Sequence, residues 1–130
     1  MSYLAHMSHV PSPASDYAAA HVRRALARDE AREVRRTSLR ARARKAAQAL
    51  YHRYGDGISV YLFGSVVEPG SFRLDSDVDL AVRGVPIDQY YEAWGLAEAV
   101  FDDGRLDLIR LEDAPTWLAE EVERRGELLS

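Results

Sequence analysis

Two aspartates separated by a single valine, Asp77 and Asp79, open an apolar run that continues to Val82. Residues two apart on a strand face the same way, so both carboxylates are predicted to project side by side while Val78 points into a core. Carboxylates this close repel each other unless a cation lies between them. The pair is therefore a candidate divalent-metal site, although Asp-Ser-Asp is also common in turns, where the side chains bond their own backbone.

Two further features favour the metal site. An apolar run from Val60 ends in Gly64-Ser65, and a glycine-serine turn beside paired carboxylates is typical of a site that holds a phosphorylated ligand on a metal ion. In Arg105-Leu-Asp-Leu-Ile109, a third carboxylate, Asp107, alternates with leucines in a short apolar strand. A charge there is costly without a partner or solvent, which indicates a functional role.

The hydrophobic pattern predicts the elements that hold these residues. Strands are predicted over residues 58–63, 78–82 and 105–111, with a short edge strand over 127–129. One helix is predicted from Pro86 to about Asp102, and another from an Asp113 cap, with Pro115 in its first turn, to Arg125. This order predicts a small α/β (α+β) sandwich, in which helices pack on one mixed sheet of three or four strands.

A long basic helix is predicted ahead of this domain. Between Tyr17 and Tyr54 there is no proline or glycine, and alanine and arginine dominate. Ser15 or Asp16 could cap one helix, or two helices with a break near Thr37-Ser38. The apolar stripe is weak before residue 46, so the C-terminal part is expected to pack on the domain and the N-terminal part to project or to meet another chain. The predicted division is a mobile tail over 1–14, the helix over 15–54 and the domain over 55–130.

Charge divides the chain in the same place. Residues 1–54 hold 11 of the 17 Lys and Arg and 4 of the 21 Asp and Glu, whereas residues 55–130 are strongly acidic. An acidic domain repels nucleic acid and attracts divalent cations, so direct nucleic-acid binding is not expected of it. The basic half could be an internal counterweight, or it could contact an acidic partner or RNA. The absence of cysteine excludes a disulfide framework and thiolate zinc, and the lack of a long apolar run or signal-peptide core favours a cytoplasmic protein without a membrane span.

The Gly-Ser, Asp-x-Asp and later strand-Asp motifs together resemble the nucleotidyltransferase superfamily that includes DNA polymerase beta. The segment from about Gly57 to Ser130 is similar to the minimal nucleotidyltransferases called MNT domains, which often pair with HEPN-domain RNase toxins in toxin–antitoxin modules. Many relatives carry an arginine directly after Gly-Ser, where this chain has Val66, and the segment before Asp-x-Asp is one residue longer than is common.

The resemblance implies an enzyme that uses Mg²⁺ and ATP. Asp77, Asp79 and Asp107 would be the catalytic metal ligands, and Gly64 and Ser65 would bind the triphosphate. Arg73 and Arg83 could neutralise phosphate or pair with Asp75 or Glu68.

The acceptor comes from the resemblance alone. In HEPN–MNT modules, AMP is thought to be transferred from ATP to a tyrosine of the HEPN toxin, so a HEPN partner in a hetero-oligomer is expected. Two alternatives stay open. One is a non-catalytic module that masks a toxin by contact, which Val66 favours and the three aspartates oppose. The other is a small-molecule nucleotidyltransferase, which usually needs an added domain for its acceptor pocket.

Overall fold

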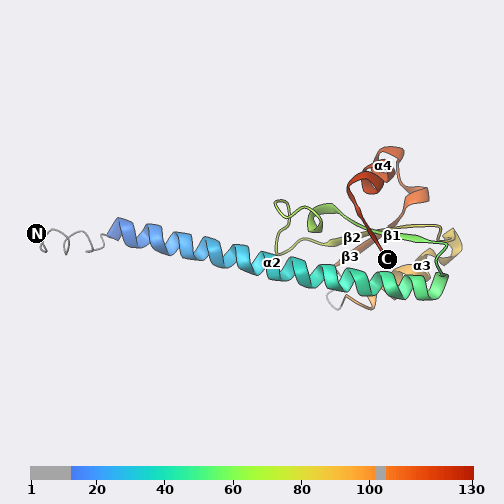
Figure 1. Cartoon of the computed structure of the whole chain (residues 1–130), viewed down its shortest axis with the longest axis horizontal. Coiled ribbons are helices and arrows are strands. Elements are labelled where there is room, and N and C mark those ends of the chain that lie inside the picture. Colours follow the sequence, from blue (N-terminus) through green and yellow to red (C-terminus); the bar gives the residue numbers. More distant parts are fainter. Residues whose placement is uncertain (1–12, 102–104) are drawn as a thin grey trace, which may run out of the picture.

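A single helix forms residues 13–54 in the computed structural model, which describes residues 13–101 and 105–130. Helix α2, Pro13–Tyr54, runs for 42 residues without a break at Thr37-Ser38. It begins two residues before the expected cap at Ser15, with proline in its first turn, where the missing N–H costs nothing. The predicted tail lies, up to residue 12, outside the described residues. Figure 1 shows the N-terminal half of α2 projecting away from the rest of the molecule.

The burial of α2 is confined to its C-terminal half. Its buried residues are Leu39, Ala43, Ala46, Ala47 and Leu50. The large apolar residues before them, Tyr17, Val22, Leu26 and Val34, are exposed. A helix rises about 1.5 Å per residue, so residues 13–38 extend about 40 Å beyond the first buried side chain. The prediction that the C-terminal part packs on the domain is confirmed.

A four-stranded mixed sheet forms the centre of the domain. Its strands are β1 Ser59–Phe63, β2 Val78–Arg83, β3 Leu106–Arg110 and β4 Glu127–Leu129. They lie in the order β3-β2-β1-β4. β1 pairs antiparallel with β2 and β4, while β2 and β3 are parallel. This confirms the predicted fold class, including the edge strand.

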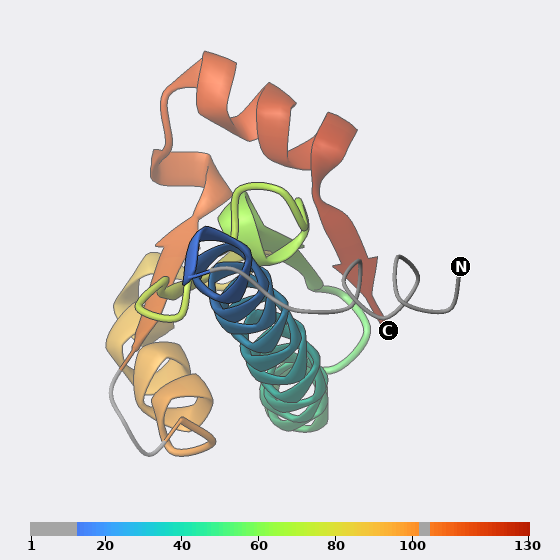
Figure 2. The same ribbon diagram turned by 90° about the vertical axis from the view of Figure 1, so that its left-hand side faces the viewer.

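Helices cover the two faces of the sheet differently. Helix α3, Tyr90–Glu98, lies beside α2 on one face, and α4, Thr116–Arg125, lies on the other (Figures 1 and 2). The main core fills the α2–α3 side and includes Val78, Leu80, Val82 and Leu108. A smaller cluster of Ala81, Leu111 and Val122 lies under α4. Successive residues of β2 and β3 therefore face opposite sides, one the main core under α2 and α3 and the next the smaller cluster under α4. The smaller cluster leaves room for polar side chains on the α4 side.

Two helix boundaries differ from the prediction. Asp113 does not cap α4, because its carboxylate accepts hydrogen bonds from Arg110 Nε at 2.9 Å and Nη2 at 3.1 Å. It lies instead in a 3₁₀ turn, Leu111–Asp113, and α4 begins after Pro115. Helix α3 ends at Glu98, and the expected end at Asp102 lies outside the described residues.

No helix in the described part of the chain is long and apolar enough to cross a membrane.

We expect that deleting residues 1–35 leaves the domain folded, because the first buried side chain is Leu39 and Arg36 still donates to the Val66 carbonyl at 2.7 Å. Thermal unfolding followed by circular dichroism should give nearly the same midpoint with and without the segment. Leu50→Ala is the positive control, since emptying this fully buried site should cost about 2–5 kcal/mol. Leu26→Ala, at a residue that is 57% exposed, should have little effect. Unfolding of the truncated protein would contradict the division of α2 at Leu39.

Candidate active site

Two of the three predicted carboxylates lie side by side. The parallel register of β2 and β3 pairs Asp79 with Asp107. Both alternate with the buried residues of their strands, so they lie on the sheet face opposite α2 and α3. Asp79 is partly buried and Asp107 is exposed. The structure therefore brings together these two residues of the motif.

The third carboxylate, Asp77, lies beside the pair, just before the start of β2. Asp77 directly precedes β2 and is exposed. Within the turn before it, the Ser76 hydroxyl accepts a hydrogen bond from the Arg73 N–H at 2.9 Å. Asp77 is close enough for its charge to act on Asp79. It thus borders the pair from the segment before β2, whereas the sequence predicted that both carboxylates would project side by side from one strand face.

Electrostatics sets Asp79 apart from the other carboxylates. Burial, and then the charges of Asp107 and Asp77, together raise the pKa of Asp79 from 3.8 to about 6. Each cause penalises the ionised form. A cation bound between the carboxylates would remove the repulsion and favour ionisation.

Gly64 brings the backbone of the next strand against this carboxylate. β1 ends at Phe63, which pairs with Asp79, and Gly64 follows with φ of +80°. A Cβ atom at Gly64 would lie 2.4 Å from Asp79 Oδ2, closer than atoms can approach. Glycine is thus required here both by the backbone angle and by the space that Asp79 occupies. Ser65 and Val66 complete a 3₁₀ turn in which the Val67 N–H donates to the Gly64 carbonyl at 3.1 Å.

The donor set suits a hard divalent cation such as Mg²⁺. All three candidate ligands are carboxylates, and the raised pKa of Asp79 shows that their charges already act on one another. In residues 13–101 and 105–130, no three Asp, Glu, His or Cys side chains form a ready-made ligand cluster. Asp77 lies exposed directly before β2 and would join Asp79 and Asp107 as the third ligand.

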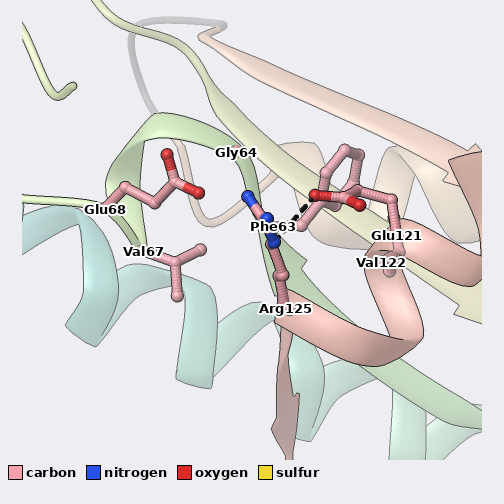
Figure 3. A pocket seen from close by; sticks show the side chains of 8 residues that line it. Phe63, Gly64, Val67, Glu68, Glu121, Val122 and Arg125 are labelled. Carbon is pink, nitrogen blue, oxygen red and sulfur yellow. Dashed lines mark ion pairs between the residues drawn. The ribbon is translucent and has the colours of Figure 1, made fainter.

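A cavity of about 120 Å³ lies on the other side of Gly64. Its lining residues are Phe63, Gly64, Val67, Glu68, Glu121, Val122, Arg125 and Gly126. Figure 3 shows Arg125 extending from the end of α4 toward Gly64, with an ion pair to Glu121 at 3.2 Å. The cavity therefore brings a cation next to the turn that was predicted to bind phosphate.

Sequence reasoning missed Arg125. It considered Arg73 and Arg83 as the nearby cations, but Arg83 lies at the far end of β2 from Asp79 and pairs with Glu123. Arg125 reaches Gly64 because β4 pairs with β1 and carries the end of α4 with it. The one available signal was the predicted edge strand directly after Arg125, and its partner strand could not be assigned from the sequence.

Comparison with known proteins assigns the domain. The family model described as "Polymerase beta, Nucleotidyltransferase" matches residues 45–130. Among solved structures, the chain is similar to one titled "Crystal structure the toxin-antitoxin MntA-HepT", with 25% identity over 70% of this chain and 71% of that chain and a TM-score of 0.48. A search of curated proteins gave no match.

We expect Asp79→Asn to stabilise the metal-free protein at pH 7.5 and to have no effect near pH 3.5. In the folded protein the pKa of Asp79 is about 6, above its unfolded value of 3.8. The stability that protonated Asp79 contributes is therefore lost as the pH rises through about 6. The uncharged amide lacks this loss. Melting temperatures across pH 3.5–8 without metal should show the two proteins diverging with increasing pH.

Addition of Mg²⁺ at pH 7.5 should then raise the melting temperature of the wild type and leave Asp79→Asn nearly unchanged, because an ion that binds only the folded state stabilises it. Asp56→Asn, in the exposed turn after α2, is the matched control and should behave as wild type. If the Asp79→Asn protein were less stable than the wild type at pH 7.5, the claim that ionised Asp79 destabilises the metal-free protein would be wrong.

Proposed function

This chain belongs to the polymerase beta nucleotidyltransferase family, and we propose that it acts as an antitoxin that transfers AMP from ATP to a tyrosine hydroxyl of a partner HEPN RNase toxin. One observation carries the catalytic part of the proposal. Asp79 and Asp107 face each other on adjacent parallel strands, with the Gly64 backbone packed against Asp79. This arrangement supports a site where the carboxylates would hold a metal ion and the Gly64 turn beside them would hold the triphosphate bound to that ion.

The carboxylates have distinct roles in this proposal. Asp77, Asp79 and Asp107 would hold Mg²⁺, which would supply positive charge to the phosphate oxygens in the transition state. Asp107, exposed on the edge strand β3, takes the proton of the attacking hydroxyl. The hydroxyl oxygen forms a bond to the α-phosphorus, the bond from that phosphorus to the bridging oxygen of the β-phosphate breaks, and pyrophosphate leaves.

Arg125 supplies the phosphate-binding cation in this proposal. The residue after Gly64-Ser65 is Val66, and its side chain is fully buried, so it contributes nothing to phosphate binding. Arg125 enters the same neighbourhood from α4. Glu68 and Glu121 also line the cavity, and a triphosphate that arrives as its metal complex carries less negative charge toward them.

The partner is proposed from the resemblance to MNT domains and from the shape of α2. The N-terminal half of α2 projects from the domain with the exposed apolar side chains of Tyr17, Val22 and Leu26, and this is a form suited to contact with another chain. The main alternative is a module that masks the toxin by contact without catalysis. Val66 favours it, whereas the packing of Gly64 against Asp79 and the pairing of Asp79 with Asp107 favour an enzyme.

The decisive experiment incubates the full chain with a candidate HEPN protein, ATP and Mg²⁺ and measures the intact mass of the partner. The proposal expects the mass of AMP to be added, with release of pyrophosphate. Asp107→Asn should lower kcat by at least about tenfold with little change in the KM for ATP, because its role is at the acceptor hydroxyl. A stable complex without added mass would support masking by contact and overturn the enzyme.

We expect Arg125→Ala to raise the KM for ATP several-fold, since one cation near the triphosphate is lost. Arg124→Ala is a matched control. Both arginines pair with Glu121, and their side chains are similarly exposed, Arg125 by 64% and Arg124 by 69%. Of the two, only Arg125 lines the cavity. Nucleotide affinity measured by calorimetry with Mg²⁺ should separate the two variants. Equal affinity in both would remove Arg125 from the site.

A further inference from the structure

A second cavity, which we call the β3-edge groove, lies beside Asp107 and is not used by the chemistry described so far. It has a volume of about 500 Å³ and lies between the start of α3, the end of β3 and the start of α4. Most of its lining is apolar: Ile87, Tyr91, Ile109, Pro115 and Leu118. Tyr91 is 86% exposed and Ile87 is 62% exposed. Exposure of these large apolar side chains to water costs free energy, which a ligand that covers them would recover.

The groove continues the carboxylate face of the sheet. Ile109 lies two residues after Asp107 on β3, so both side chains leave the strand on the same face, about 7 Å apart along it. Between them, the Leu108 carbonyl accepts a hydrogen bond from the Tyr90 hydroxyl. Tyr90 also contacts Tyr91 and Trp94 edge to face, with ring centroids 5.5 Å and 5.9 Å apart. The wall next to Asp107 is therefore fixed in place before any ligand binds.

The charges around the groove favour a basic ligand. Among the described residues that line it, the one cation is Arg110. Its guanidinium is held by Asp113 and donates to the Val85 carbonyl at 2.7 Å, so it is already engaged. Asp88 is exposed next to Ile87, and Asp107 is exposed at the other end. An apolar segment flanked by Lys or Arg fits this lining better than an acidic one.

The position of the groove matches the acceptor side of the reaction. In an in-line displacement, the attacking and leaving oxygens lie on opposite sides of the phosphorus. The Gly64 turn and Arg125 lie toward β1 and β4, while the groove lies at the β3 edge. The carboxylates of β2 and β3 lie between them.

We propose that the β3-edge groove binds the acceptor polypeptide, through an apolar segment with flanking basic residues that places its hydroxyl against Asp107. The inference rests on the proposed function, because it assigns the substrate-binding surface of that same site. It names a feature of the acceptor that the catalytic residues do not specify, namely its flanking sequence.

The test uses the full chain and two blocked peptides as probes, Arg-Leu-Tyr-Leu-Arg and Glu-Leu-Tyr-Leu-Glu. In NMR titrations of the ¹⁵N-labelled protein without ATP or metal, the basic peptide should shift the amides of Tyr91, Ile109 and Leu118, and it should bind at least about tenfold more tightly than the acidic one. Tyr91→Ser and Ile87→Ser should each weaken this binding about five- to tenfold. Leu128→Ser is the matched control, since Leu128 is 59% exposed but lies on β4 at the other edge of the sheet.

Transfer of labelled AMP to the basic peptide is measured in parallel. Binding in the groove without transfer would support the groove and count against the enzymatic function. Transfer with equal kcat/KM in wild type, Tyr91→Ser and Ile87→Ser would overturn the groove and leave the function standing. The groove proposal is also overturned if neither peptide shifts its amides, if Mg²⁺ and ATP shift them in place of the peptide, or if they shift with protein concentration alone, which would identify a second copy as the occupant.

Discussion

The candidate site depends on two carboxylates that the fold holds together against their repulsion. The β2–β3 register places Asp79 beside Asp107, and the cost of keeping Asp79 ionised, which comes first from burial and then from the charges of Asp107 and Asp77, appears as its raised pKa. The opposite face of the same strands offsets it, because Val78, Leu80 and Leu108 are fully buried under α2 and α3. A slip of either strand by one residue would place a carboxylate in that core and a leucine or valine outside. The alternation that places Val78, Leu80 and Leu108 in the core therefore also places Asp79 and Asp107 together on the opposite face.

The cation of the site is held by a longer chain of contacts. Arg125 reaches the Gly64 turn because β4, which begins two residues later, pairs with β1. α2 secures this short strand: the Tyr51 hydroxyl donates to the Leu129 carbonyl at 2.6 Å, and Arg40 forms an ion pair with Glu127. The same Tyr51 hydroxyl accepts the Val60 N–H at 3.1 Å, which ties β1 to the arrangement. The C-terminal half of α2 thus supports the proposed phosphate side of the site, through β4 and through the hydrogen bond from Arg36 to the Val66 carbonyl of the Gly64–Val66 turn.

Local patterns predicted the strands and the carboxylates, whereas the contacts between distant segments could not be predicted. Period-two alternation around Asp79 and Asp107 predicted which side chains face the core. The neighbour of Asp79 in space depends on strand order, which the sequence does not encode locally, so Arg125 was missed. Asp113 was taken as a helix cap because its type favours that position, but the guanidinium of Arg110, three residues earlier, binds the carboxylate instead. α2 passes through Thr37-Ser38 unbroken, since the surrounding Ala and Arg favour helix more than these two residues oppose it.

The exposure of Asp107 bears on how the proposed transfer would be restricted to its acceptor. Asp79 is partly covered by the Gly64 turn, but Asp107 lies open to solvent at the edge of the sheet. Water at that position would compete with the acceptor hydroxyl and hydrolyse ATP. A polypeptide that fills the β3-edge groove would cover this side of the site and exclude water, which also strengthens the electrostatic interactions inside it. On this argument the domain alone forms only the nucleotide side of the site, and the acceptor itself completes the other wall.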